Sequence, residues 1–518
     1  MKILLVYPNV RGMNMLPPAI ALFSALLKRD GHSVALFDST DYPNPEGDYF
    51  NSDKEKEKNL NARPFDDSKL KLSYKDEDVF NAFCHKVNNF KPGLIAMSCT
   101  EDMFPIGISL LKKIKGKRIP VIMGGVFPTF APELSLSYPE VNMICVGEGE
   151  DALTELCRRM DSNQDYNDIP GIWLKQKDGT IKRNAISPLV PMEKNPKLDL
   201  SIFDEGRLYR PMQGRVWRMF PLETHRGCPY KCAYCNSPSQ QDLYKKETSS
   251  SFFRKKDFNK IRDEIIMFRD EFNAEAFYFW ADTFFAYSVK EFDEFIEMYS
   301  EFNIPFWCQT RPETVTYERV KQLTEIGMFR IAFGLEHGNH EFRKKVVGRD
   351  LSNDVIIKAM REVNRIGVPY SVNNIIGFPY EKRELVFDTI ELNKQFTPDN
   401  SNAYSFSPFH GTPLRKTAEE EGYIQKGEIA RSIMRPTVLN MPYFTPDQIE
   451  GIRRCFTLYV KLPKYRWHQI EQAEKLTPEG DIIWKELVEE VSELNSDTDW
   501  KIKPDTSFED LAMGSMDN

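Results

Sequence analysis

Short runs of apolar residues alternate with amphipathic stretches through residues 1–160 of the chain. Each run has the length of one buried strand, and the stretches between the runs repeat apolar residues at the spacing of a helix that faces a core. This alternation predicts a doubly wound parallel sheet with helices on both faces. The predicted strands are Lys2–Tyr7, Ser33–Phe37, Leu94–Ser98, Val121–Met123 and Val141–Val146, and the first predicted helix is Pro18–Arg29.

Two segments depart from this rhythm. The stretch from Asp41 to about Asp76 is rich in Asp, Lys, Asn and Pro, which predicts a solvated insertion. Residues 161–210 are predicted to be a linker that contains one hairpin, Gly171–Leu174 with Ile181–Asn184, around the turn Asp178-Gly179.

A second strand–helix alternation begins near Arg218. Six successive βα units predict a partial (β/α)6 barrel over residues 211–425, whose functional residues would lie at the carboxyl ends of the strands. Residues 426–518 are predicted to be mostly helical, and the tail from Ser507 is expected to fray. The predicted fold is therefore α/β, with an N-terminal Rossmann-like sheet, a central partial barrel and a helical C-terminal region. The barrel strands are expected at Met219–Thr224, Ala276–Trp280, Pro305–Gln309, Phe329–Gly334, Tyr370–Ile376 and Ala403–Ser407.

Composition adds limits to this picture. A chain of 518 residues is too long for one hydrophobic core, so several domains are expected. With 41% hydrophobic and 28% charged residues, it has the composition of an ordinary globular protein. The net charge of −8 gives no reason to expect nucleic acid as a partner. The sequence shows neither a bilayer-spanning apolar run nor a signal peptide, and a cytoplasmic location is expected.

Three of the nine cysteines, Cys228, Cys232 and Cys235, directly follow the first predicted barrel strand. Gly227 and Pro229 favour a turn that would bring their thiols to one metal centre. Thiolates in such a loop bind either zinc or an iron–sulfur cluster. A zinc site usually adds a second pair of ligands, and no second Cys-x-x-Cys or His pair follows. A four-iron cluster on three cysteines would leave one iron open for chemistry.

The Cys-x-x-x-Cys-x-x-Cys spacing, with aromatic Tyr234 before the last cysteine, resembles the signature of the radical S-adenosylmethionine (SAM) superfamily. The resemblance implies a 4Fe-4S cluster on the three cysteines, SAM at its open iron, and an electron donor such as flavodoxin or ferredoxin. It also implies SAM contacts from this loop and from the ends of later barrel strands. The residues expected to make them are Tyr234, Asp282, Gln309, Arg311, Glu336 and Ile376.

The segments Leu16–Ile20, Gly124–Glu133 and Val146–Glu150 resemble the cobalamin-binding domain that precedes the barrel in one large radical SAM subfamily. The last two of these segments lie just past predicted strands, where ligands enter a doubly wound sheet. A nucleotide-binding or purely structural domain is the alternative. The resemblance implies cobalamin contacts from Gly124, Gly125, Thr129, Gly147, Glu148 and Gly149.

The cobalamin motif Asp-x-His-x-x-Gly is incomplete in this chain. Asp30-Gly31-His32 begins it, but Ala35 stands where the motif has glycine. The resemblance therefore implies cobalamin with its own base displaced, no histidine on cobalt, and a lower face against the Val10–Leu16 loop.

Together the two resemblances imply a cobalamin-dependent radical SAM methyltransferase. Such an enzyme would methylate an unactivated carbon of a small-molecule or natural-product substrate, using a 5′-deoxyadenosyl radical and methylcobalamin. The alternatives are a radical oxidative cyclase or ring-rearranging enzyme of the same architecture, and a non-catalytic cobalamin- or zinc-binding regulatory module. His410, after the sixth barrel strand, either faces the substrate or is an ordinary turn histidine.

Overall fold

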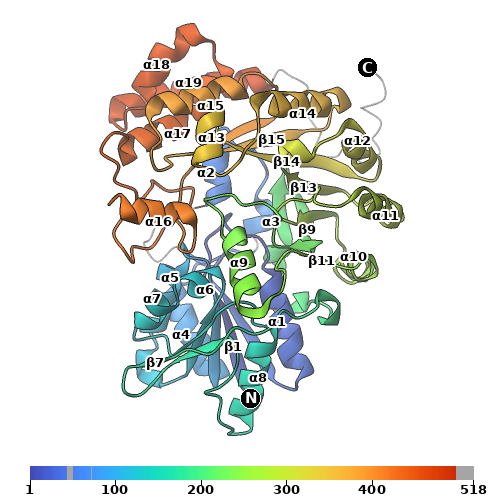
Figure 1. Ribbon diagram of the computed structural model, residues 1–518, viewed down its shortest axis with the longest axis vertical. Coiled ribbons are helices and arrows are strands. Elements are labelled where there is room, and N and C mark those ends of the chain that lie inside the picture. The colour runs from blue at the N-terminus through green and yellow to red at the C-terminus, as the bar shows by residue number, and fades with distance from the viewer. Residues whose placement is uncertain (44–50, 72, 497–518) are drawn as a thin grey trace.

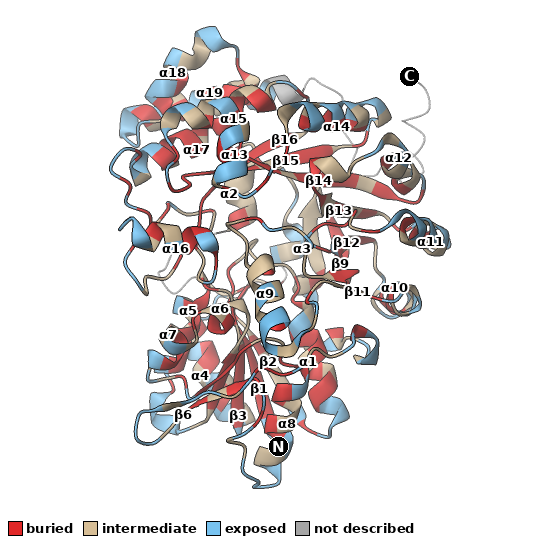
Figure 2. Cartoon of the chain, viewed as in Figure 1, coloured by how far each residue is buried: buried red, intermediate tan, exposed pale blue. Residues whose placement is uncertain are grey.

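The computed structural model describes residues 1–43, 51–71 and 73–496. Two sheets lie one above the other along the long axis of the molecule, with the N-terminal sheet at the bottom of Figure 1 and the second sheet above it. In Figure 2 the strands of both sheets are largely buried, and exposed residues are concentrated on the outer faces of the helices. Among the described residues, no helix is both long enough and apolar enough to cross a bilayer. The tail after Ser507 lies outside the described residues.

The first sheet has the strand order β2-β1-β3-β4-β5-β6-β7. Strands β1 to β5 are parallel, as predicted, and their apolar residues are covered on one face by α1 and α8 and on the other by α4 and α5. The hairpin expected in the linker adds β6 and β7 antiparallel to the β5 edge. The strands are β1 (Lys2–Tyr7), β2 (Ser33–Asp38), β3 (Leu94–Ser98), β4 (Val121–Gly124), β5 (Met143–Cys145), β6 (Ile172–Lys175) and β7 (Ile181–Lys182). The helices are α1 (Pro18–Arg29), α4 (Val79–Phe90), α5 (Phe104–Lys112), α6 (Val126–Phe130), α7 (Pro132–Ser137) and α8 (Glu150–Asp161).

The second sheet has the order β16-β15-β14-β13-β12-β9-β8 and curls into a half-barrel. The six strands from β9 to β16 are parallel, which confirms the predicted partial barrel, whereas β8 adds an unpredicted antiparallel edge. The strands are β8 (Tyr209–Met212), β9 (Arg215–Glu223), β12 (Ala276–Trp280), β13 (Phe306–Thr310), β14 (Met328–Glu336), β15 (Tyr370–Ile376) and β16 (Asn400–Ser405), with the short pair β10 (His225–Arg226) and β11 (Arg254–Lys255) beside them. The helices are α9 (Asn236–Thr248), α10 (Phe258–Phe272), α11 (Val289–Tyr299), α12 (Tyr317–Glu325), α13 (His340–Lys345), α14 (Asn353–Ile366), α15 (Arg383–Asn393) and α16 (Pro413–Glu420).

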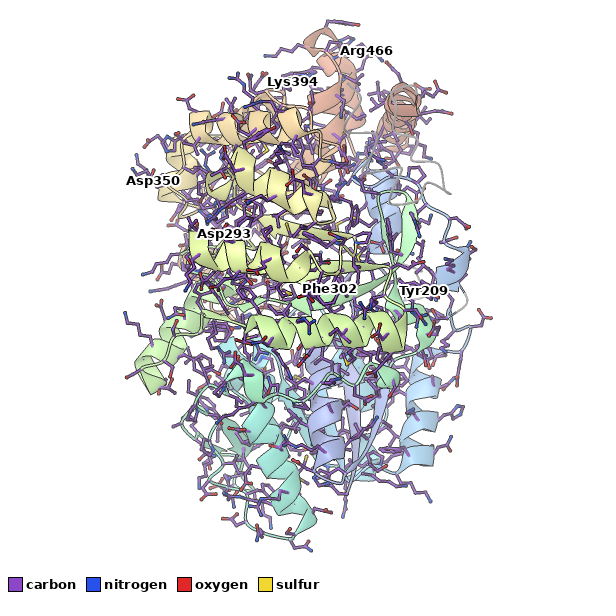
Figure 3. All side chains as sticks on the ribbon, turned by 90° about the vertical axis from the view of Figure 1, so that its right-hand side faces the viewer. Tyr209, Asp293, Phe302, Asp350, Lys394 and Arg466 are labelled. Carbon is purple, nitrogen blue, oxygen red and sulfur yellow. The ribbon has the colours of Figure 1, made fainter. Side chains whose placement is uncertain are left out.

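The C-terminal region is helical, as predicted. Helix α17 (Pro446–Lys461) packs against β16 and α15, and α18 (Trp467–Ala473) and α19 (Pro478–Ser496) pack on α17. In the side view of Figure 3, the labelled Asp293 lies on the outer helical layer and Arg466 lies at the far end of the C-terminal helices.

The segment 51–64, predicted to be solvated, instead packs between the two edges of the half-barrel. It contains α2 (Ser52–Lys58), and α3 (Ser68–Lys71) follows. At the β16 edge, the Asn400 amide donates a hydrogen bond to the Leu60 carbonyl over 3.4 Å. At the β8 edge, Asp53 lies 3.4 Å from Arg210. We call residues 51–64 the strap. The prediction was wrong for the strap because its polar residues pair with polar groups far away in the chain, while residues 44–50 and 72 lie outside the described residues.

Candidate functional site

The three-cysteine loop lies between β10 and α9. Gly227 has φ +83°, and a Cβ atom there would lie 2.8 Å from the Phe252 ring, so glycine is required at the start of the turn. The backbone N–H of Ala233 donates to the Val347 carbonyl over 2.9 Å, and the carbonyl of Ala233 accepts from the Leu414 N–H over 3.0 Å. The loop is therefore held by backbone contacts from two other parts of the barrel.

The three thiols are electrostatic neighbours of one another. Cys232 Sγ accepts a hydrogen bond from Arg311 over 3.2 Å, and Cys235 Sγ accepts one from the Ser237 N–H over 3.4 Å. Burial raises the pKa of Cys235 to about 12, so a bound metal is what would keep this group as a thiolate. Within the described residues, no three His, Cys, Asp or Glu side chains converge on one point as a single ion requires. In a cube of four irons each of the three thiolates would bind a different iron.

Glu336 and Arg349 form a buried ion pair beside this loop. Arg349 Nη1 lies 2.8 Å from Glu336 Oε1, and Glu336 ends β14 with a left-handed φ of +71°. Burial raises the pKa of Glu336, although Arg349 and the neighbouring Tyr234 hydroxyl oppose the rise. The Nε and Nη2 atoms of Arg349 are buried without hydrogen-bond partners. Such orphaned donors are what a bound polar ligand would satisfy. Arg349 was not predicted, because it lies in a turn after α13 that carries no motif.

The other residues expected to contact SAM lie around the same strand ends. Asp282 follows β12 and is an electrostatic neighbour of Cys228 and Cys235. Arg311 follows β13, stacks on Tyr230 with 3.8 Å between its guanidinium carbon and the ring centroid, and bonds to Cys232. Their charges suit the amino and carboxylate groups of SAM.

The side chains of Gln309 and Ile376 are less available to a ligand than those of Asp282 and Arg311. The Gln309 amide donates to the Ala281 carbonyl over 3.2 Å, so part of its hydrogen-bonding capacity is used inside the protein. The Ile376 side chain is fully buried in the core cluster shared with Phe378 and Val386. The Ile376 carbonyl accepts a hydrogen bond from the Phe406 N–H over 2.8 Å, so neither its side chain nor this carbonyl is free for a ligand.

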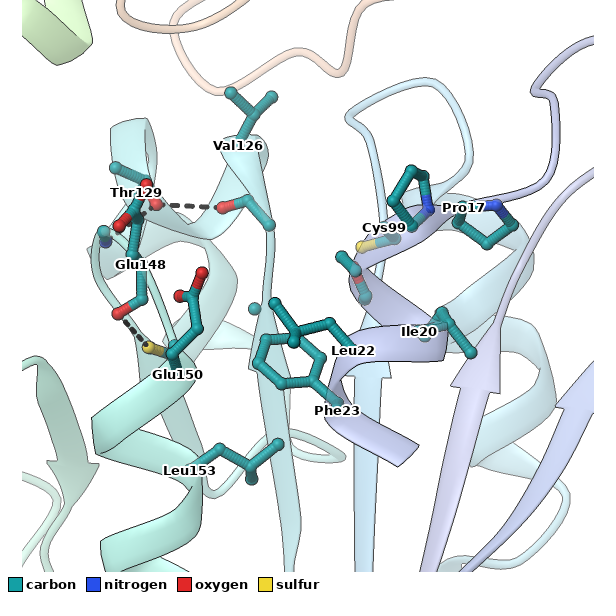
Figure 4. A pocket seen from close by; sticks show the side chains of 18 of the residues that line it. Pro17, Ile20, Leu22, Phe23, Cys99, Val126, Thr129, Glu148, Glu150 and Leu153 are labelled. Atoms are coloured by element: carbon teal, nitrogen blue, oxygen red, sulfur yellow. Dashed lines mark hydrogen bonds between the residues drawn. The ribbon is translucent and has the colours of Figure 1, made fainter. Parts of the chain in front are cut away.

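A cavity of about 420 Å³ lies at the carboxyl ends of β1, β3, β4 and β5. Its walls are mainly apolar and include Ile20, Leu22, Phe23 and Leu153, with the labelled Phe23 lying between α1 and Leu153 in Figure 4. The far wall comes from the barrel and includes Tyr244, Phe252 and Trp280, which were not predicted. All six residues expected to contact cobalamin line the cavity, namely Gly124, Gly125, Thr129, Gly147, Glu148 and Gly149.

Two glycines of the cavity have no room for a side chain. Gly125 has φ +111°, and a Cβ there would lie 2.5 Å from the Cys99 carbonyl oxygen. Gly147 has φ +88°, and a Cβ there would lie 2.5 Å from the Tyr244 hydroxyl oxygen. Thr129 links the two turns, because its hydroxyl donates to the Gly125 carbonyl over 2.9 Å and accepts from the Gly147 N–H over 3.0 Å. These turns offer backbone to a ligand at close range, as a cobalamin tail would need.

No histidine is among the described residues that line the cavity. His32 lies at the opposite, amino end of the sheet, where its Nδ1 is 3.2 Å from the N-terminal amino group. Pro17 and Pro18 line the cavity, while the Val10–Leu16 loop turns toward the barrel and packs Met15 against Trp217 and its neighbours.

An ion network joins the cavity to the cysteine loop. Arg226, two residues before Cys228, lies 2.8 Å from Glu148 and 2.7 Å from Glu150 of the first sheet. Glu148 also pairs with Arg254. Burial alone would lower the pKa of Arg226, but the surrounding carboxylates raise it well above its usual range, so the charge persists. Glu148 therefore touches the cavity and the base of the cysteine loop at once.

His410 takes part in a second contact between the two halves. Its Nδ1 lies 2.7 Å from Oε1 of buried Glu101, and its backbone N–H donates to Glu101 Oε2 over 2.8 Å. The Ala430 N–H also donates to Glu101 over 2.8 Å. His410 thus fixes the barrel against the loop after β3.

The comparisons with known proteins agree with this geometry. Residues 222–392 match the family model of the radical SAM superfamily, and residues 71–157 match that of the B12 binding domain. A protein of Pyrococcus horikoshii named an uncharacterized methyltransferase is 23% identical, with 75% of this chain and 83% of that protein covered. Cytidylyl-2-hydroxyethylphosphonate methyltransferase of Streptomyces wedmorensis is 19% identical, with 82% of each chain covered. The anaerobic magnesium-protoporphyrin IX monomethyl ester cyclase of Rubrivivax gelatinosus is 22% identical, with 72% of this chain and 67% of the cyclase covered.

Two solved structures share the fold over nearly the whole chain. The cobalamin-dependent SAM radical enzyme OxsB has a TM-score of 0.63 at 16% identity and covers 98% of this chain and 74% of its own. The methyltransferase TsrM from Kitasatospora setae, with cobalamin and a 4Fe-4S cluster bound, has a TM-score of 0.61 at 14% identity and covers 96% and 99%. With a B12-binding domain N-terminal to a radical SAM domain, and hence a 4Fe-4S cluster, SAM and cobalamin as cofactors, this chain belongs to the cobalamin-dependent radical SAM enzyme family.

Proposed function

We propose that this enzyme methylates an unactivated carbon of a small-molecule substrate. The observation that carries the proposal is the position of the cavity, which opens onto the barrel at Trp280, two residues before Asp282 beside the cysteine loop. When bound, the cluster and SAM supply a carbon-centred radical, and cobalamin carries a methyl group. Relatives with methyltransferase names, from Pyrococcus horikoshii and Streptomyces wedmorensis, support this choice of reaction.

The chain's own residues have separate tasks in this proposal. Cys228, Cys232 and Cys235 hold the cluster. Glu336 and Arg349 lie where they can orient the SAM ribose and exclude water, because both are buried. Gly125 and Gly147 offer backbone to the cobalamin tail. Reduction of the cluster requires an external donor, for which flavodoxin or ferredoxin is the proposed class.

An oxidative cyclase or ring-rearranging enzyme is the second candidate. It is favoured by the likeness to the Rubrivivax cyclase and to 4′-phospho-dehydrooxetanocin synthase of Priestia megaterium, which is 25% identical over 280 residues. The same cofactors would serve both reactions.

Product analysis separates the two candidates. Methylation consumes SAM for two purposes, so anaerobic turnover with substrate should form 5′-deoxyadenosine and S-adenosylhomocysteine in matching amounts. Formation of 5′-deoxyadenosine without a matching amount of S-adenosylhomocysteine would overturn the methyl-transfer proposal and favour the second candidate. Slow SAM cleavage by the dithionite-reduced enzyme, measured without substrate, serves as the control that the radical half is active.

A further inference from the structure

Side chains on the inner face of the barrel are not fully buried. Along β12, Phe277 and Phe279 are fully buried under the outer helices, while Tyr278 and Trp280 on the other face keep accessible surface. Along β13, buried Cys308 alternates with the partly accessible Trp307 in the same way. Strand residues that face the inside of a filled barrel would be shielded. Their accessibility shows an internal space beside these strands.

Three side chains from different elements border this space. Tyr278 of β12, Tyr404 of β16 and Lys56 of the strap are each half-buried and keep solvent-accessible surface, which is 24% for the Lys56 side chain. Arg210 is close enough to Tyr278 to act on its pKa, and Asp53 is close enough to Tyr404 to act on that residue. The strap therefore faces the inside of the barrel between β8 and β16.

One wall of the space is aromatic and reaches the cobalamin cavity. Tyr278 and Trp307 stack with ring centroids 4.9 Å apart and an interplanar angle of 18°. Trp280 lies 5.7 Å from Tyr278 and, at 36% exposure, also lines the cavity. A flat apolar group on this wall would extend from the barrel interior toward bound cobalamin.

The opposite part of the space carries an excess of positive charge. Asp53 is shared by two cations, with Lys56 Nζ at 3.6 Å and Arg210 at 3.4 Å. Burial lowers the pKa of Lys56, and Asp53 is the one carboxylate that opposes this. Arg210 Nη2 donates to the Gly12 carbonyl over 3.2 Å and to Asp53 over 3.4 Å, which leaves part of its guanidinium for another acceptor. Lys56 Nζ, at 3.6 Å from Asp53, is too far for a strong hydrogen bond, so its donors stay available to the space. Two largely buried cations that share one carboxylate leave a net positive charge, which a bound anion would offset.

We infer that the barrel binds a substrate with a flat apolar body and an anionic group, a carboxylate or a phosphate, held by Lys56 and Arg210. The apolar body lies on the Tyr278–Trp307 wall and directs the reacting carbon toward the cobalamin cavity. This inference rests on the proposed function, which supplies the reaction that the carbon undergoes. The strap, which the family motifs do not include, supplies the specificity.

The test uses holoenzyme with cluster, cobalamin and SAM, in anaerobic equilibrium dialysis against small probes. The probes are 1-naphthaleneacetate, 1-naphthyl phosphate and the neutral 1-naphthaleneacetamide. At least one anion should bind, and the amide should bind about tenfold or more weaker, the effect of losing one charge-assisted hydrogen bond. The anion that binds better identifies the substrate group. Failure of both anions to bind, or equal binding of the amide, would overturn the inference.

Variants separate the charge from the aromatic wall. Lys56→Gln and Arg210→Gln should remove the preference for anions, and Arg210→Lys should restore part of it. Lys58→Gln is the matched control, because Lys58 lies on the same helix but is 57% exposed and pairs with Glu55. Trp307→Leu should weaken the anion and the amide alike. An anion preference that survives both glutamine variants, or that Lys58→Gln removes equally, would contradict the role of the strap.

Binding needs no turnover, so this test is independent of the proposed reaction. Anion selectivity in an enzyme that forms no S-adenosylhomocysteine would support the site and remove methyl transfer. Formation of S-adenosylhomocysteine by an enzyme without anion selectivity would support methyl transfer and remove the anion site.

Discussion

The two halves of the site are built in different ways. The cavity on the first sheet is made of glycine turns and apolar side chains, with Gly125, Gly147 and Phe23 as examples. The half at the barrel mouth is made of buried charges, with Glu336 on Arg349 and Arg311 on Cys232. One half therefore selects its ligand by close approach of backbone and by apolar surface, the other by charge and hydrogen bonds.

This difference follows from what each half holds. A large ligand that must fit against strand ends needs space, and any added side chain removes some of it. A small charged ligand at a metal needs fixed polar groups, whose burial is favourable only when they are paired. Glu148 belongs to both halves, because it lines the cavity and pairs with Arg226 before the cysteine loop. Substitutions in one half should therefore leave the function of the other half measurable.

The largest expected effect is loss of the cluster. Cys232→Ala removes one of three ligands, and we expect anaerobically reconstituted protein to hold no stoichiometric four-iron cluster, measured as iron content and visible absorption. Cobalamin should still bind, because the cavity does not include Cys232. Cys308→Ala changes a buried cysteine of β13 and is the control, and this variant should hold as much iron as the native protein. A Cys232→Ala protein with full iron content would contradict the ligand assignment.

The second effect concerns the buried charges of the barrel. Glu336→Ala should keep cluster and cobalamin but lower 5′-deoxyadenosine formation by about 100-fold, because misplacement of a reacting group costs rate steeply. Glu336→Gln retains an acceptor for Arg349, so its rate of 5′-deoxyadenosine formation should fall between those of Glu336→Ala and the native enzyme. Glu341→Ala, at an exposed residue of α13, provides the matched control. Unchanged SAM cleavage in Glu336→Ala would remove this residue from the site.

The third effect tests the shape-based half. Gly147→Ala should weaken cobalamin binding by about tenfold or more, since the methyl group must displace the Tyr244 hydroxyl and the backbone strain adds about 1 kcal/mol. Gly179→Ala is the matched control: its φ of +85° is nearly the same, but its Cβ would meet nothing within 4 Å. Gly179 does not line the cavity, so Gly179→Ala should bind cobalamin like the native enzyme, and equal affinity in the two variants, by titration of the visible spectrum, would contradict the role of Gly147.

Local patterns predicted the elements that depend on local sequence. Ala276–Trp280 and Tyr370–Ile376 have the bounds expected, because each is an uninterrupted strand pattern between helices. The six cobalamin candidates were implied by the family resemblance of segments that follow strands, and all six line one space. Which of the candidate residues contact the cofactors stays a prediction.

Contacts between distant parts of the chain were beyond this reasoning. Arg226 meets Glu148 across 78 positions, and Glu101 meets His410 across 309 positions, with no local pattern at either partner. The strap looks solvated in sequence because several of its contacts are made with the distant elements β8, β16 and α17. Charge pairing at long sequence separation is what the pattern of apolar residues does not encode.

The smallest expected effect concerns the contact that fixes the two halves together. His410→Ala removes the imidazole partner of Glu101 but leaves the two backbone N–H donors at 2.8 Å, so we expect about 1–2 kcal/mol less stability. Thermal unfolding of the apoprotein measures this loss, and His340→Ala, at a partly exposed histidine 3.3 Å from Asp350, is the control. Cluster and cobalamin content should not change, because His410 does not line the cavity and the substitution keeps the His410 carbonyl that accepts from Asn236 beside the cysteine loop. If His410→Ala instead lowered deoxyadenosine formation as strongly as Glu336→Ala does, this histidine would face the substrate, and the charge-based half of the site would extend to β16.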